Sequence, residues 1–258
     1  MNVIFGNHYK ILLLIAFAVL GVIGTFLLVP AIPQDPSYHQ FADRTTRLGI
    51  PNFGDVTSNL PLLLVGWAGI RALQRGEVTI PPELRSAYLA FFIGVALVGP
   101  GSMYYHLAPD NATLVWDRLP MTIAFMAMFA FVVAEYLSVS AGRTLLWPLL
   151  VIGFISVFYW HVTETQGRGD LRLYGLVQFL PLVLIPVIML LFQPTFTNVA
   201  YLWALIGAYG VAKVAEFLDG PIYQVFPLSG HTIKHLVAAL GVYWLLMGLR
   251  RRSKIANR

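Results

Sequence analysis

Long apolar stretches separated by short polar or Pro/Gly-rich breaks dominate the pattern along the chain. A membrane-spanning α-helix needs roughly 20 mostly apolar residues to cross a bilayer core of about 30 Å. Stretches of about that length cover residues 11–30, 56–73, 86–106, 117–138, 144–161, 172–192, 199–217 and 231–249. The pattern therefore predicts an all-α integral membrane protein with eight transmembrane helices in one unit.

The first stretch has an alternative interpretation as a signal peptide. The segment that follows it, Val29-Pro30-Ala31-Ile32-Pro33, is a poor cleavage site, which favours a retained helix. The alternative arrangement has seven spans, with this first helix either cleaved or lying along the membrane interface. The loops are short except for residues 31–55, and no soluble domain or fixed-period repeat is visible.

Composition excludes an ordinary soluble protein. The chain is 58% hydrophobic and 11% charged, whereas soluble domains have roughly 45–50% apolar and about 25% charged residues. A water-soluble monomer of this composition would expose large contiguous apolar patches. Cysteine is absent, which excludes disulfides, thiolate metal ligands and a cysteine nucleophile.

The basic residues indicate an orientation. With eight spans, ten Lys and Arg residues flank the helices on the side of the two termini, and five flank them on the other side. The positive-inside rule then predicts cytoplasmic termini and, in a bacterium, a place in the cytoplasmic membrane. The basic cluster from Arg250 to Lys254 predicts contact with anionic lipid and not with nucleic acid.

Three polar groups lie near one end of the bundle. Ser102 and His106 are four residues apart on the third predicted helix, Asp117 opens the fourth, and His231 and His235 are four apart on the last. Because of the helix directions, all of them fall in the non-cytoplasmic leaflet. An ionisable side chain at mid-bilayer costs about 2.5–3.5 kcal/mol, so these groups are functional candidates.

Two histidines at positions i and i+4 present their rings side by side, as in helical zinc sites. With a third histidine and a water, they would form an open catalytic zinc site. A haem site or a proton relay would use the same residue types, and spacing alone leaves these alternatives open. We interpret His8, His39 and His161 as flanking or interfacial residues.

Several motifs together resemble the alkaline ceramidase family, in a superfamily with adiponectin/progestin-type receptors. The matching pattern is a serine and a histidine four residues apart, an aspartate eleven residues later and a late His-x3-His pair. The resemblance covers residues 52–250 and rests on Asp55-Val56-Thr57-Ser58-Asn59, Gly101-Ser102-Met103-Tyr104-Tyr105-His106, Asp117 with Leu119-Pro120-Met121, and His231-Thr232-Ile233-Lys234-His235.

The resemblance implies a fold and a domain organisation. A seven-helix hydrolase core would occupy residues 56–250, preceded by an additional N-terminal transmembrane helix in 1–30 and a non-cytoplasmic loop in 31–55. A basic cytoplasmic tail would follow in 251–258.

The resemblance also implies a reaction. Zinc would be held by His106, His231 and His235, with Ser102 and Asp117 close to the zinc-activated water. That water would cleave the amide bond of a ceramide-like N-acyl sphingoid lipid to a fatty acid and a sphingoid base. Asp117 would act as general base and then acid, and Ser102 as a hydrogen-bond donor.

Calcium, a second ion of the family, is not supported by the residues here. Asn52 replaces the family's glutamate, Asp55 replaces an asparagine, and the family's acidic tryptophan-containing segment is absent. An ion bound there would use the oxygens of Asp35, Asp43, Asn52 and Asp55. A solvated or helix-capping loop is the simpler interpretation, with Asp55 as an N-cap.

A further polar set has no counterpart in the family pattern. Lys213 and Glu216 are three residues apart, which predicts an ion pair. The group around Glu164, Asp170 and Arg172 lies on the outer side, where it would shape a headgroup entrance. Two rival functions stay open: a seven-helix lipid-sensing receptor that binds zinc, and a transporter or proton relay.

Overall fold

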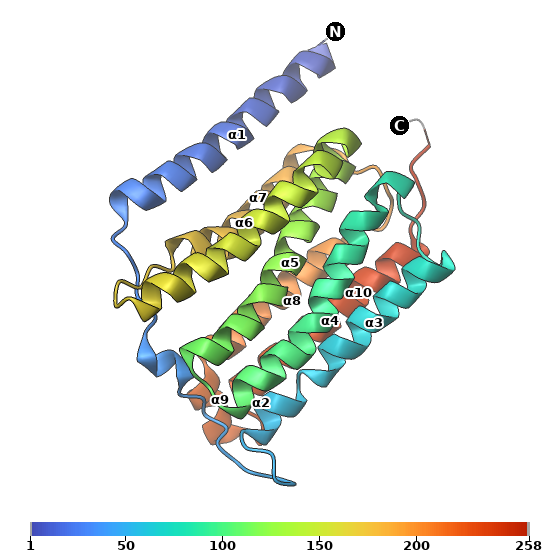
Figure 1. Cartoon of the computed structure of the whole chain (residues 1–258). Helices are drawn as coiled ribbons and strands as arrows, with labels where there is room; N and C mark the ends of the chain where they lie inside the picture. The colour runs from blue at the N-terminus through green and yellow to red at the C-terminus, as the bar shows by residue number, and fades with distance from the viewer. Residues whose placement is uncertain (1, 257–258) are drawn as a thin grey trace.

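The computed structural model describes residues 2–256, with side chains from residue 8 onward. Figure 1 shows a bundle of long helices, and the described residues contain no β-strand beyond two isolated bridges. The helices are α1 (Asn2–Leu28), α2 (Phe53–Thr57), α3 (Leu60–Arg75), α4 (Arg85–Leu107), α5 (Asn111–Tyr136), α6 (Val139–Thr165), α7 (Arg172–Leu191), α8 (Ala200–Phe217), α9 (Asp219–Val225) and α10 (Gly230–Arg251), with 3-10 turns η1 (Pro36–His39) and η2 (Pro82–Leu84).

Seven helices in the described part of the chain are long and apolar enough to cross a membrane. An eighth span is present if α8 and α9 are taken together, although their axes are bent by 78°. The all-helical, multi-pass architecture expected from the hydropathy pattern is therefore confirmed, with seven to eight spans.

The second predicted helix, 56–73, is divided in the structure. It begins at Phe53, ends at Thr57 and resumes at Leu60, with Pro61 in the first turn of α3. Asp55 therefore lies inside α2, and its interpretation as an N-cap is wrong. Asn52 occupies the N-cap position in the left-handed conformation, with φ of 48°.

Helix α5 is at the centre of the bundle, where α4, α6 and α7 pack against it. Small residues permit the close approach of backbones that stabilises helix pairs in lipid. A Cβ atom on Gly94 of α4 would lie 2.7 Å from the Ala124 nitrogen of α5. Helix α8 packs against α10 in a similar way, where a Cβ on Gly241 would lie 2.7 Å from the Ala208 Cβ.

The two ends of the chain lie at one end of the bundle, and α2 and α9 lie at the other (Figure 1). At the end of the bundle near the C-terminus, Arg252 forms a buried, bidentate ion pair with Glu135, with distances of 2.6 and 2.9 Å. Arg250 pairs with Glu77 at 2.7 Å. Two cations of the basic cluster are thus bound within the protein, and its contact with anionic lipid stays a prediction.

Candidate metal centre and catalytic cavity

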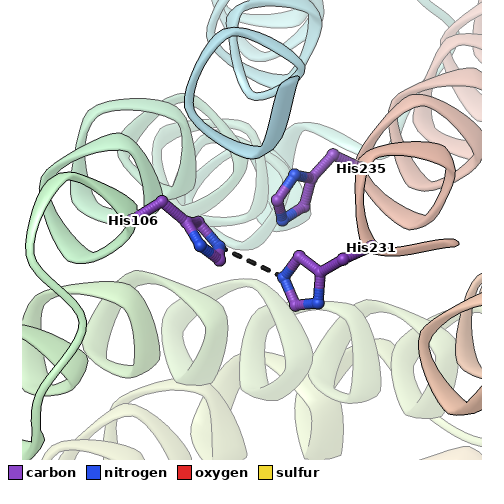
Figure 2. A group of neighbouring side chains, drawn as sticks. All are labelled: His106, His231 and His235. Atoms are coloured by element: carbon purple, nitrogen blue, oxygen red, sulfur yellow. Dashed lines mark hydrogen bonds between the residues drawn. The ribbon is translucent and has the colours of Figure 1, made fainter. Parts of the chain in front are cut away.

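Three histidines from two helices converge at the end of the bundle that holds α2 and α9. His106 comes from the last turn of α4, and His231 and His235 come from the first two turns of α10 (Figure 2). Their ligand atoms all lie within 4.8 Å of one another, and each side chain is at most 4% exposed. In the described part of the chain, this is the group of His, Asp and Glu residues able to hold a metal ion.

Local interactions at the start of α10 place the histidine pair. Ser229 caps the helix by accepting a hydrogen bond from the Thr232 backbone, and the His231 backbone N–H donates to Asp219 Oδ1 at 2.8 Å. His235 follows one helical turn later on the same face. The bend between α8 and α9 therefore supplies an acceptor that fixes the position of His231.

A second set of contacts orients the histidine side chains and the end of α4. Ser58, in the break between α2 and α3, lies 2.8 Å from His235 Nδ1 and donates its own proton to the Asp55 carbonyl. With Nδ1–H donating to Ser58, the Nε2 lone pair of His235 stays available to a cation. Asn52 Nδ2 donates to the His106 carbonyl at 2.7 Å and so ties the loop to the last turn of α4.

The nitrogen atoms of this group fit a metal ion. His106 Nδ1 is buried without a hydrogen-bond partner, and the Nε2 atoms of His106 and His231 face each other at 3.1 Å. Buried polar atoms without partners are costly, and a bound cation would use such lone pairs. Three neutral imidazoles are a ligand set of catalytic zinc sites.

Ser102 and Asp117, the two predicted catalytic side chains, are brought together beside the histidines. Ser102 lies one helical turn before His106 on α4, and its side chain is a polar neighbour of the Asp117 carboxylate on α5. Both side chains are buried, and both line the same cavity as His235.

This cavity has a volume of about 760 Å³ and is lined mostly by apolar side chains. Its lining includes Ser102, Asp117 and His235, the charged residues Arg118, Lys213, Glu216 and Lys234, and apolar residues such as Leu62, Val98, Met121, Phe125 and Ala238. On the loop side, the Phe41 ring packs against His106 and His231, with centroids 4.5 and 4.4 Å apart. Phe41 therefore covers His106 and His231 on the side of the loop, and His235 borders the largely apolar cavity.

Lys234 is a functional candidate that the sequence analysis did not identify. Its Nζ lies 2.7 Å from His231 Nε2 and 3.1 Å from Glu216 Oε1. Glu216 also pairs with Lys213, as predicted. The signal was present in the sequence, because Lys234 is three residues after His231 and shares its helix face.

The four residues considered for a second ion have protein partners. Asp35 is exposed and caps η1, while Asp43 accepts from the Gly54 backbone at 2.7 Å and from Thr45 Oγ1 at 2.6 Å. Asp55 Oδ1 accepts from Ser229 and Thr232, each at 2.8 Å. The aspartates form no metal-binding group of three in the described residues, and the expectation that calcium is not supported here stays a prediction.

The ceramidase family model matches residues 49–218, about two thirds of the chain. This region contains Ser102, His106 and Asp117. It leaves out α1 and also α10, whose histidines reach the site through the packing of the helices. A comparison with curated proteins gives no match. Ceramidases are hydrolases that act on amide bonds, with ceramide as the lipid substrate. The family resemblance noted in the sequence is thus confirmed, and the chain belongs to the ceramidase family.

Proposed function

We propose that the protein is a zinc-dependent intramembrane amidohydrolase that converts ceramide-like N-acyl sphingoid lipids to a fatty acid and a sphingoid base. The observation that carries this proposal is the group of three buried histidines, of which His235 lines a largely apolar cavity together with Ser102 and Asp117. The volume of this cavity, about 760 Å³, lies within the roughly 300–1,000 Å³ range of ligand pockets.

His106, His231 and His235 would hold the zinc ion through neutral ring nitrogens. When bound, zinc would supply Lewis-acid activation of the amide carbonyl and of water. Ser58 would keep the His235 ring in the tautomer and orientation that binding requires.

Asp117 would perform the proton transfers. Its carboxylate accepts a proton as water adds to the carbonyl carbon, and it returns that proton to the nitrogen as the C–N bond breaks. Ser102, the neighbour of Asp117, would donate its hydroxyl proton to the Asp117 carboxylate before proton transfer. Once Asp117 has accepted a proton, Ser102 would donate toward the developing negative charge on the carbonyl oxygen. The products are a carboxylic acid and an amine, as the overall addition of water to an amide requires.

The proposal includes an orientation in the membrane. The site lies at the end of the bundle away from the chain termini (Figure 1). With the termini in the cytoplasm, as the distribution of Lys and Arg predicts, the reaction would take place in the non-cytoplasmic leaflet.

The test combines metal analysis with turnover by the purified full-length protein. We expect one zinc ion per chain and release of a free fatty acid from ceramide, detected by mass spectrometry. His231→Ala should lose both zinc and turnover, and His161→Ala, which alters a histidine outside the site, should keep both. Active protein without stoichiometric zinc would contradict the metal assignment. Zinc-loaded protein that binds ceramide without cleaving it would favour a receptor.

A further inference from the structure

Helix α1 lies outside the region that matches the family, yet it forms part of the cavity wall. Gly21 and Thr25 of α1, four residues apart, and Val29, just after the end of α1, line the same cavity as Ser102, Asp117 and His235. The two helical residues are about 6 Å apart along the helix axis, at roughly 1.5 Å per residue. Most other side chains of α1 are exposed, and its principal helix contact is with α7.

The cavity extends around α7 from the bundle interior to α1. Tyr174 and Gln178 are buried on the inner face of α7, and Gln178 Nε2 donates to the Tyr209 hydroxyl of α8 at 2.7 Å; all three residues line the cavity. Phe179 and Val183 are about half exposed on the outer side of α7, and they line the same cavity. Residues on several faces of one helix therefore border one continuous space.

Two glycines, Gly175 on α7 and Gly21 on α1, leave the cavity unfilled beside these two helices. A Cβ on Gly175 of α7 would meet no heavy atom within 4 Å, and one on Gly21 of α1 would meet only Leu180, at 4.0 Å. The Thr25 hydroxyl donates to the Gly21 carbonyl at 2.8 Å, so this side chain presents mainly its methyl group to the groove. The groove between α1 and α7 is consequently unfilled and bordered mainly by apolar groups.

The structure fixes the C-terminal end of α1 to the core at the mouth of this groove. Arg172 donates to the Val29 carbonyl at 2.8 Å, stacks on the Phe26 ring and forms a bidentate pair with Asp170. Hydrogen bonding from Arg172 lowers the pKa of Asp170 to about 2, so the pair is ionised at neutral pH. The following residues are held as well, because the Leu171 N–H donates to the Ile32 carbonyl at 2.8 Å.

We infer that α1 is the outer wall of the lipid-binding path, and that one alkyl chain of the substrate lies between α1 and α7, with Gly21 limiting its length. This inference rests on the proposed function for the identity of the substrate. The occupant follows from continuity, because the groove opens into the chamber that holds Ser102 and Asp117. An apolar groove in this place suits an alkyl chain and not a headgroup.

The test is the substitution Gly21→Leu, which fills the groove without a backbone clash. Gly24→Leu is the matched control, because Gly24 lies on the same helix, has open space around it and does not line the cavity. Leucine is a better helix former than glycine, so both variants should fold. Thermal unfolding in detergent verifies this for each.

Turnover is measured with two series of lipid amides, one varying the acyl chain and the other varying the sphingoid base. In one series, Gly21→Leu should lower turnover of the longest substrates relative to the shortest by about tenfold, the effect of losing roughly two buried methylene groups. The series that responds identifies the chain that occupies the groove. Gly24→Leu should keep the wild-type profile. Unchanged profiles for Gly21→Leu in both series would overturn the inference.

A binding measurement separates this inference from the proposed reaction. A pyrene-labelled fatty acid is bound to the wild-type protein and displaced with unlabelled fatty acids of increasing length. Weaker binding of long chains to Gly21→Leu, but not to Gly24→Leu, would support the groove even if no lipid amide were cleaved. Equal displacement curves for all three proteins, with turnover profiles unchanged, would exclude α1 as a wall of the lipid site.

Discussion

His106 Nε2 and His231 Nε2 lie 3.1 Å apart, although 125 positions separate the two residues in the chain. They come from the end of α4 and the start of α10, two helices that run in opposite directions at this end of the bundle. Two buried ring nitrogens at this distance, with a third histidine beside them, are the centre of the proposed site (Figure 2).

Ser58 should control metal affinity without taking part in the reaction. Ser58→Ala removes the nearer of the two partners of His235 Nδ1, the other being Asn59 Nδ2 at 3.2 Å. The loss of such an outer-shell hydrogen bond typically costs 10–100-fold, so we expect a reduction in zinc affinity toward the lower end of that range. Zinc titration against a competing chelator measures it. The neighbouring Thr57→Ala is the control, because Thr57 bonds only the Phe53 carbonyl. Equal zinc affinities for the two variants would contradict this role.

Lys234 should oppose metal binding. Its ammonium group lies 2.7 Å from His231 Nε2, where it occupies a lone pair that a metal would use and repels a divalent cation. Lys234→Met should therefore raise zinc affinity several-fold in the same titration. Lys213→Met, which removes the other partner of Glu216, should have a smaller effect. A lower affinity in Lys234→Met would show that Lys234 shapes the histidine group.

Asp117 and Ser102 should act as a unit in the chemical step. Asp117→Asn should lower kcat by about 10²–10⁴, the usual contribution of a general acid–base, while zinc content stays unchanged. Ser102→Ala should also lower kcat with zinc retained. Because the two side chains are neighbours that would act on the same proton, the double variant should lose less than the product of the single losses. Independent, multiplicative losses in kcat would argue against this coupling.

The ion pair between Arg252 and Glu135 should stabilise the end of the bundle near the C-terminus. Arg252→Leu leaves Glu135 buried and without its cation, which typically costs about 3–5 kcal/mol of unfolding free energy. Arg250→Leu breaks the exposed pair with Glu77 and should cost at most about 1 kcal/mol. Thermal unfolding in detergent should show a clear decrease in Tm for the first variant alone. Similar Tm values for both would refute the structural role of the buried pair.

Much of the fold was predictable because a membrane imposes a local rule on sequence. Each spanning helix must be apolar over its own length, so hydropathy located the spans. Their polar ends were less well placed, since α1 begins at Asn2 and not at residue 11, and α5 begins at Asn111 and not at residue 117. The break at Ser58 and Asn59 was not predicted, because α2 has only five residues, among them Asp55 and Thr57, and gives no hydropathy signal of its own. Helix α9 was not predicted either, because its seven residues include Asp219, Gly220 and Pro221 and form no long apolar stretch.

The candidate site was predictable in its ligands and not in its surroundings. Ser102, His106, Asp117, His231 and His235 stood out as polar residues within apolar spans and as a family pattern. The contact of Lys234 with His231 and that of Ser58 with His235 depend on side-chain positions that spacing does not specify.

The sequence by itself determined that the protein lies in a lipid bilayer, where its spans approximately are, and which residue types could bind a metal. Each of these is a property of single segments of the chain. Only the tertiary structure decided that His106 meets His231 and His235, and that α1 borders the cavity. The physical reason is that these relations depend on how helices pack. Packing is set by small residues and buried polar contacts spread over the whole chain.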